Sequence, residues 1–194
     1  MDTKSSYSRE TKQYSWIEKH YGSRRGFLRT YWYAILYYIG KYNHLKQVEW
    51  HAIERLVFIC KGNICRSAYA EAIARSIGIN TISCGLDTIE DAPANTSAQY
   101  AAKKRGVTLT EHKTKPIMYQ ILRKSDLIIV MEPWQAGFIK QHLMRGYRCT
   151  LLGLWGHPVL PHIQDPYGAS PKYFDVCFEY IENCVHEIAE KIKK

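Results

Sequence analysis

Short apolar runs alternate with helical patterns along the chain from residue 54 onwards. Four of the runs are typical of buried strands: residues 56–59, 80–83, 126–131 and 149–152. Between and after them the sequence predicts five helices: residues 67–77, 96–105, 117–124, 134–144 and 171–191. Strands that alternate with helices favour βαβ units. Because such crossovers are right-handed, we predict an α/β fold with a doubly wound, four-stranded parallel sheet and helices on both faces.

The first 53 residues have a different pattern, and we treat residues 1–53 as an N-terminal extension of a domain formed by residues 54–194. Residues 1–22 are polar and show no hydrophobic period, so we expect them to be poorly ordered. Residues 24–42 are aromatic and basic, and they predict an extra helical segment. Its apolar face is expected to consist of Phe27, Leu28, Tyr31, Ile35, Tyr38, Ile39 and Tyr42.

Two roles are open for the helix predicted in residues 24–42. Its apolar run is too short to cross a bilayer, which needs about 20 such residues. Arginine and lysine flank the run, so the helix could lie on a membrane surface. Alternatively, it packs on the domain or on a second copy of the chain in a homodimer.

Net charge and cysteine content indicate which partners and which cellular compartment suit the protein. The net charge of +9 suits acidic partners such as phosphates or anionic lipid, but it does not choose among them. No nucleic-acid recognition motif is present, so we do not expect nucleic-acid binding. The polar start of the chain resembles no secretory signal, so we expect a cytoplasmic protein whose six cysteines are reduced thiols. If the helix in residues 24–42 binds lipid, the protein would be peripheral at the inner membrane face. Their spacing fits no metal site, and we expect neither metal nor cofactor.

A candidate phosphate-binding loop follows the first predicted strand. Residues 60–67 read CKGNICRS and lead directly into a helix. In open parallel sheets, ligands bind beyond the carboxyl ends of the strands. Backbone N–H groups of such a loop, together with the helix N-terminus, attract anions. Gly62 and Asn63 tolerate the left-handed backbone that a tight loop requires.

The side chains of this loop suit phosphoryl transfer. A Cys60 thiolate at its rim would be stabilised by the N–H groups and could act as a nucleophile. The Arg66 guanidinium can hold two phosphate oxygens, and Ser67 could donate a hydrogen bond to the Cys60 sulfur. The spacing C-x5-R alone is a weak motif, but the strand before it and the helix after it strengthen the interpretation.

A candidate proton donor lies in the loop before the last helix, in the sequence Asp165-Pro166-Tyr167. Expelling a tyrosine phenolate calls for an acid, because phenol has a pKa of about 10. A carboxyl group at the same edge of the sheet would serve, so we assign this role to Asp165. Tyr167 could form a wall of the pocket.

Taken together, the motif in residues 60–67, the Asp-Pro-Tyr sequence and the run DLIIVM in residues 126–131 resemble the low-molecular-weight protein-tyrosine phosphatases. The resemblance covers roughly residues 55–192 and implies hydrolysis of phosphotyrosine through a phosphocysteine intermediate. It also implies that Cys65 can form a reversible disulfide with Cys60 under oxidants. The residues that it implies bind phosphate or support the loop are Lys61, Gly62, Asn63, Ile64, Cys65, Ser67, Ser83 and His112.

Within the family, the chain resembles the bacterial branch that works with tyrosine kinases controlling capsule and exopolysaccharide export. Many members place Trp or Tyr on the pocket wall, where this sequence has the aliphatic Ile89. The resemblance therefore implies a phosphotyrosine protein as substrate, with such a kinase as a candidate partner.

Two alternatives stay open. One is arsenate reductase on the same fold, which needs further cysteines on a mobile segment. The cysteines that follow the loop form no close pair: Cys84, Cys149, Cys177 and Cys184. The other alternative is a scaffold or membrane-binding protein that works through residues 1–53.

Overall fold

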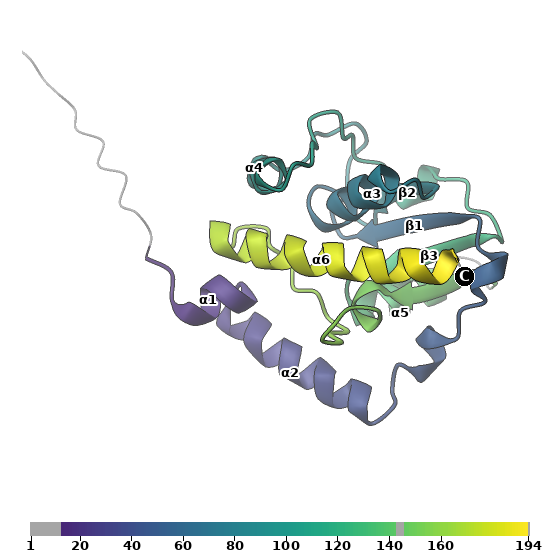
Figure 1. Cartoon of the computed structure of the whole chain (residues 1–194), viewed down its shortest axis with the longest axis horizontal. Coiled ribbons are helices and arrows are strands. Elements are labelled where there is room, and N and C mark those ends of the chain that lie inside the picture. The colour runs from purple at the N-terminus through teal and green to yellow at the C-terminus, as the bar shows by residue number, and fades with distance from the viewer. Residues whose placement is uncertain (1–12, 143–145, 194) are drawn as a thin grey trace, which may run out of the picture.

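The predicted sheet is present in the computed structural model, which describes residues 13–142 and 146–193. Its four strands are β1 (Arg55–Cys60), β2 (Thr81–Gly85), β3 (Asp126–Val130) and β4 (Arg148–Leu151). They are parallel and lie in the order β2-β1-β3-β4 (Figure 1). Because β1 lies between β2 and β3, the loop that follows it opens where the order of strands reverses, which is the usual ligand position in such sheets.

Helices cover both faces of this sheet, as predicted. The α-helices are α1 (Trp16–Tyr21), α2 (Arg24–Tyr38), α3 (Arg66–Ser76), α4 (Thr96–Lys104), α5 (Pro133–His142) and α6 (Pro171–Ile192). Helix α3 packs against β1, β2 and α6, whereas α5 packs against β3 and β4. Single 3-10 turns occupy Asn43–Lys46, Trp50–Ala52, Ile117–Tyr119 and Leu152–Leu154.

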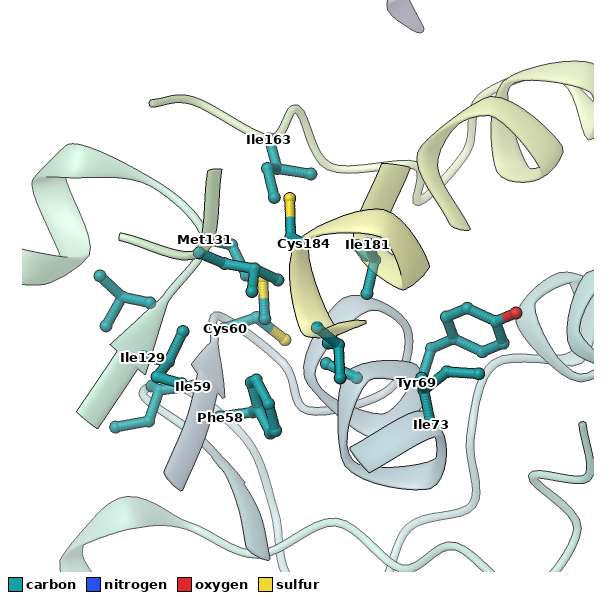
Figure 2. Packing of buried hydrophobic residues seen from close by; sticks show 14 of the residues in the cluster. Phe58, Ile59, Cys60, Tyr69, Ile73, Ile129, Met131, Ile163, Ile181 and Cys184 are labelled. Carbon is teal, nitrogen blue, oxygen red and sulfur yellow. The ribbon is translucent and has the colours of Figure 1, made fainter. Parts of the chain in front are cut away.

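The core lies between the sheet and the pair α3 and α6. The side chains of β1 and β3 are almost entirely buried, as their continuous apolar runs predict. Tyr69 of α3 stacks on Phe178 of α6 with ring centroids 3.8 Å apart, which joins the two helices. Figure 2 shows how side chains of β1, β3, α3 and α6 meet. This packing fixes the end of β1 and the start of α3, between which the candidate loop is suspended.

The extension is more ordered than its sequence suggests. Within residues 13–22, which we expected to be poorly ordered, α1 forms because Ser15 and Glu18 make a capping box. Its sequence signal, Ser followed by Glu three residues later, was present but unsupported by any hydrophobic period. Helix α1 packs against α2 and α6 (Figure 1). Residues 1–12 lie outside the described residues.

Helix α2 is present, but most of the apolar face predicted for it is turned outward. Of the predicted residues, Tyr42, which follows the helix, is buried and Phe27 is half-buried. Leu28, Ile35 and Ile39 are exposed, and Tyr38 is 84% exposed. Tyr33 and other partly buried residues of α2 pack against the core instead. The helix has apolar side chains on two faces, and hydropathy alone does not say which one meets the domain. No helix in the described part of the chain is long and apolar enough to cross a membrane.

The helix predicted for residues 117–124 is also wrong in its length. The structure has a single 3-10 turn at Ile117–Tyr119. Ile117 is buried, whereas Met118 and Ile121 are strongly exposed. With so little apolar surface to bury, the segment lacks the tertiary packing that stabilises most short helices. The other predicted bounds in residues 54–194 differ by at most two residues from the observed ones, and residues 143–144 of one predicted helix lie outside the described residues.

Candidate active site

The loop after β1 has its carbonyl groups turned outward. Four of them accept hydrogen bonds from the surrounding chain: Cys60 from Leu86 N (3.1 Å), Lys61 from Asp87 N (2.9 Å), Asn63 from His112 Nε2 (2.7 Å) and Ile64 from Asn95 N (2.9 Å). Because the N–H and C=O of a trans peptide point in opposite directions, the N–H groups that follow these carbonyls face the hollow of the loop. This is the arrangement of N–H groups that an anion cradle requires.

Two residues were expected to tolerate a left-handed backbone here, and only one of them adopts it. Asn63 has a φ of 54°, whereas Gly62 is not among the residues with positive φ. A Cβ on Gly62 would contact only Ile64, the next loop side chain but one. Asparagine stabilises this conformation because its amide can hydrogen-bond locally.

Cys60 ends β1 with its sulfur directed into the loop. The Sγ atom lies 3.0 Å from Ser67 Oγ and accepts a hydrogen bond from Asn63 N at 3.3 Å. The residue is only 3% exposed, although it is surrounded by donors rather than by apolar atoms alone. A group that reacts with this sulfur must therefore reach down into the loop.

The amide of Asn63 holds the loop from behind. Its Nδ2 donates to Ser67 Oγ at 2.9 Å and to Ser83 Oγ at 2.8 Å, and its Oδ1 accepts from Lys115 N at 3.0 Å. Every donor and acceptor of the amide thus has a partner, as a buried polar group requires. The structure brings together Asn63, Ser67 and Ser83 as the resemblance implied.

A buried carboxylate completes this network, and the sequence analysis missed it. Glu71 accepts a hydrogen bond from Ser83 Oγ at 2.5 Å and forms an ion pair with Arg75. His112 Nδ1 lies 4.0 Å from Glu71, and burial lowers the pKa of this histidine. The available signal was a charged residue on the inward face of α3, where only a paired carboxylate is tolerated.

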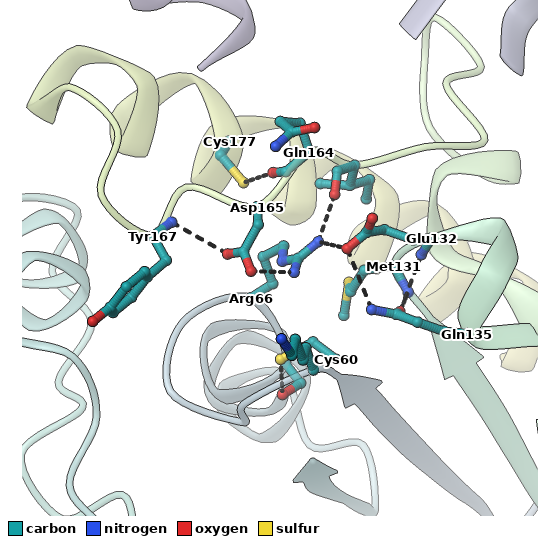
Figure 3. Close-up of polar contacts among 12 residues, drawn as sticks. Cys60, Arg66, Met131, Glu132, Gln135, Gln164, Asp165, Tyr167 and Cys177 are labelled. Atoms are coloured by element: carbon teal, nitrogen blue, oxygen red, sulfur yellow. Dashed lines mark hydrogen bonds and ion pairs between the residues drawn. The ribbon is translucent and has the colours of Figure 1, made fainter. Parts of the chain in front are cut away.

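Arg66, the first residue of α3, is buried beside the loop and meets the predicted acid. Its Nη2 lies 2.8 Å from Asp165 Oδ2, and its Nη1 donates to Ile163 O at 2.7 Å (Figure 3). Its Nε has no hydrogen-bond partner in the described part of the chain. Burial alone would lower the pKa of this guanidinium, but the carboxylates of Asp165 and Glu132 raise it.

Glu132 is the second residue that the sequence analysis missed. It follows β3, and its Oε1 accepts a hydrogen bond from Arg66 Nη1 at 2.7 Å. Trp134 Nε1 donates to its other oxygen at 3.0 Å, and Gln135 also contacts it (Figure 3). A charged residue directly after a buried parallel strand was a usable signal, because functional residues gather at that edge of the sheet.

Asp165 is the most accessible of the three residues predicted to be catalytic. Its side chain is 37% exposed, and its Oδ1 accepts a hydrogen bond from Tyr167 N at 3.2 Å. Tyr167 and Ile89, the predicted pocket walls, both have exposed side chains. Lys61 is likewise exposed and lies 3.7 Å from Asp87. The structure thus places a buried sulfur and guanidinium below an accessible carboxylate.

The other cysteines differ from Cys60 in their surroundings. Cys84 and Cys149 lie in strands, while Cys177 and Cys184 lie in α6 and Cys65 lies in the loop. Burial raises the pKa of Cys84, Cys149 and Cys177 to about 12, and it also raises the pKa of Cys65 and of Cys184. Since the thiolate is the reactive form, these thiols are poor nucleophiles. Cys84, Cys149, Cys177 and Cys184 also lie in regular strands and helices. Arsenate reduction would instead need a second thiol on a mobile segment.

Comparison with known proteins agrees with this geometry. Residues 55–194 match the family described as low molecular weight phosphotyrosine protein phosphatase, and the chain belongs to this family. It is therefore a cysteine-based phosphoric monoester hydrolase by family, which confirms the predicted class of enzyme.

Three relatives illustrate the range of similarity. The chain is 28% identical over 145 residues to the probable low molecular weight protein-tyrosine-phosphatase EpsP of Ralstonia nicotianae, covering 73% of this chain and 97% of EpsP. It is 26% identical over 147 residues to the protein-arginine-phosphatase of Bacillus subtilis, covering 72% and 97%. The crystal structure of the Erwinia amylovora tyrosine phosphatase AmsI aligns with a TM-score of 0.67 at 26% identity, covering 73% and 95%.

Proposed function

We propose that this protein hydrolyses phosphotyrosine in proteins, with Cys60 as nucleophile, Arg66 as phosphate-binding residue and Asp165 as general acid. The proposal rests on one arrangement: the Cys60 sulfur lies within a ring of inward-facing N–H groups, and Arg66 joins that ring to Asp165 at 2.8 Å. Because Cys60 is only 3% exposed, a long aryl side chain can deliver its phosphate to the sulfur better than a short serine side chain can.

In the first step, the Cys60 thiolate attacks phosphorus and forms the S–P bond while the bond to the tyrosyl oxygen breaks. The protonated Asp165 carboxyl donates its proton to the leaving phenolate. The inward-facing N–H groups and the unpartnered Nε–H of Arg66 stabilise the oxygens of the transferring phosphoryl group. Glu132 keeps the opposite side of the guanidinium fixed.

In the second step, water hydrolyses the phosphocysteine. The Asp165 carboxylate takes a proton from the attacking water, the S–P bond breaks, and inorganic phosphate leaves. This returns Cys60 to the thiolate and Asp165 to the acid. Cys65, two residues before the end of the loop motif, would protect the nucleophile by forming a reversible disulfide with it under oxidants.

The test is turnover of phosphotyrosine, phosphoserine and phosphoarginine peptides of one sequence by the full chain. We expect hydrolysis of the phosphotyrosine peptide, inhibition by vanadate, no effect of a chelator and no turnover by Cys60→Ser. Phosphoarginine is included because one relative is a protein-arginine-phosphatase. A preference for that peptide would overturn the assignment of substrate while leaving the nucleophile in place.

For the physiological substrate, we propose a bacterial tyrosine kinase that controls polysaccharide export. The support is the resemblance to the bacterial branch of the family and the similarity to the relative EpsP. Incubating the phosphorylated kinase of the same cell with the wild-type protein should remove its phosphotyrosine, whereas Cys60→Ser should bind without release. Equal activity on unrelated phosphotyrosine proteins would contradict this specificity.

We also propose that α2 places the enzyme against an anionic membrane surface. Four apolar side chains follow one line along its outer face, at spacings of a helical stripe: Leu28, Trp32, Ile35 and Ile39, all exposed. Basic side chains on the same segment, at Arg24, Arg25, Arg29 and Lys41, are exposed as well. An apolar stripe with basic flanks suits the interface of an anionic bilayer. The alternative occupant is a second copy of the chain.

A further inference from the structure

The general acid is carried by a segment without regular structure, residues 162–165, here called the acid segment. On its inner side, Ile163 N donates to Met131 O at 2.9 Å, and Ile163 O accepts from Arg66 Nη1 at 2.7 Å. Asp165 has two further contacts, with Arg66 and with Tyr167 N. A segment of this kind owes its position to whatever packs on both of its sides.

The outer side of the acid segment is covered by the N-terminal extension. Tyr33 of α2 stacks on the imidazole of His162, with ring centroids 4.9 Å apart and planes inclined by 23°. His162 is buried; its Nε2 lies 3.2 Å from Gln164 Oε1 and its Nδ1 lies 3.7 Å from Glu132 Oε2. Since Glu132 also holds Arg66, one ring of the extension reaches the phosphate-binding side chain through two intermediate residues.

A second contact fixes the residue next to the acid. Gly26 of α2 is buried against Gln164, and a Cβ at this position would lie 3.0 Å from Gln164 Cγ. The backbone of Gln164 is held from the opposite side, because Tyr173 of α6 donates to Gln164 O at 3.2 Å (the Cys177 sulfur contacts the same oxygen, Figure 3). The residue before Asp165 is therefore held between α2 and α6.

We infer that α2 is a brace for the general acid, and that Tyr33 is a positioning residue that acts through His162 on the acid segment. The inference rests on the proposed function of Asp165. It assigns to the extension a catalytic contribution that the family domain, which begins at residue 55, does not contain. Catalysis by a general acid depends on placement, and a displacement of about 1 Å can cost up to about 100-fold in rate.

The experiment uses the full chain with Tyr33→Ala and Tyr33→Phe, and with Tyr38→Ala as the matched control. Tyr38 lies on the same helix but is 84% exposed. Each variant is assayed on phenyl phosphate, whose leaving group needs protonation, and on para-nitrophenyl phosphate, whose leaving group needs little. We compare kcat/KM, because it reports the first step, in which the leaving group departs, and not the later hydrolysis of the phosphocysteine, in which Asp165 acts on water with either substrate. We expect Tyr33→Ala to lower kcat/KM on phenyl phosphate about 10-fold and on para-nitrophenyl phosphate less than about 2-fold. Tyr33→Phe keeps the ring and should restore kcat/KM.

Two further readouts separate positioning from folding. Partial unfolding removes active enzyme and lowers both rates equally, so the ratio of the two kcat/KM values is insensitive to it. In an Asp165→Ala background, Tyr33→Ala should leave that ratio unchanged, because there is no acid left to position. If Tyr33→Ala is too unstable to assay, Tyr33→Leu, which fills the space without stacking, serves in its place.

The outcomes distinguish this inference from the proposed function. If the wild-type chain hydrolyses neither aryl phosphate, the proposed function fails. If the wild-type chain is active and Tyr33→Ala gives the same ratio as Tyr38→Ala, the brace is disproved and the proposed function stands. A Tyr33→Ala effect that persists in the Asp165→Ala background would also overturn the inference, because the ring would then act on something other than the acid.

Discussion

Arg66 Nη2 lies 2.8 Å from Asp165 Oδ2, so the proposed phosphate-binding side chain is paired with the proposed acid before any substrate enters. A phosphate dianion would compete with Asp165 for this guanidinium. The Asp165 carboxyl would then lose this contact and keep the one with Tyr167 N.

Replacing Asp165 by alanine tests this role directly. We expect kcat on phosphotyrosine to fall by about 100-fold or more, because a positioned acid contributes about 10²- to 10⁴-fold. Phosphate binding should survive, since Arg66 keeps its bonds to Glu132 and to Ile163 O. Competition by inorganic phosphate measures the binding. Full activity of Asp165→Ala on phosphotyrosine would show that another group protonates the phenolate.

Ser83 should be needed for the stability of the phosphate loop. Its hydroxyl accepts from Asn63 Nδ2 and donates to Glu71 Oε2, so Ser83→Ala leaves a buried amide and a buried carboxylate each short of a partner. We expect the free energy of unfolding to fall by about 1–3 kcal/mol, together with kcat. Urea denaturation measures the first quantity. Ser97→Ala, at an exposed position of α4, is the control and should change stability by less than about 0.5 kcal/mol.

Much of the site was predictable because its signals are local. The loop in residues 60–67 combines nucleophile, guanidinium and helix start within eight residues, and residues 165–167 form a similarly short motif. Strands β1 and β3 were predicted from continuous apolar runs. Helix α6 was predicted from a strong inward stripe, whose central residues Phe178 and Ile181 are fully buried.

The parts that escaped prediction depend on contacts between distant segments. Glu71 and Glu132 matter through Ser83 and Arg66, which lie 12 and 66 residues away in the sequence. Helix α2 has two apolar faces, and only its packing on His162 reveals that Tyr33 points inward. Hydrophobic periodicity predicts that a helix forms, but tertiary contacts decide which of its faces is buried.

Stability should depend on pH through His112. Burial lowers the pKa of this histidine below its usual value of about 6.5, so near neutral pH it is uncharged in the folded chain. Below that value the unfolded chain binds the proton more readily than the folded chain does. The contribution of His112 to stability is therefore fully present above about pH 6.5 and is lost as the pH falls towards its folded pKa.

Urea denaturation at about pH 7.5 and about pH 5.5 measures this loss. We expect His112→Gln, which can still donate to Asn63 O, to lose less stability over this interval than the wild-type chain. His162, whose pKa is also lowered by burial, should contribute a loss of the same sign in both proteins. An equal decrease in the two proteins would show that protonation of His112 does not destabilise the fold.

The exposed stripe of α2 should bind anionic vesicles. Trp32 and Ile39 are 58% and 71% exposed, and burying them in a lipid interface removes apolar surface from water. Sedimentation with phosphatidylglycerol vesicles should recover the wild-type chain, and recovery should fall as salt screens the basic flanks. The double substitution Trp32→Ser and Ile35→Ser should abolish recovery. Ile121→Ser, which removes an even more exposed apolar side chain outside the extension, should not.

The same variants decide between a membrane and a second copy of the chain. Both substituted residues are exposed, and Gly26 and Tyr33 are the residues of α2 that meet the acid segment, so kcat on a soluble aryl phosphate should stay within about 2-fold of the wild-type value. If the stripe instead joins two copies, the wild-type chain should sediment as a dimer without lipid and the double variant as a monomer. A wild-type monomer that ignores vesicles would refute both occupants, because an apolar stripe with basic flanks would then have neither a lipid nor a protein partner.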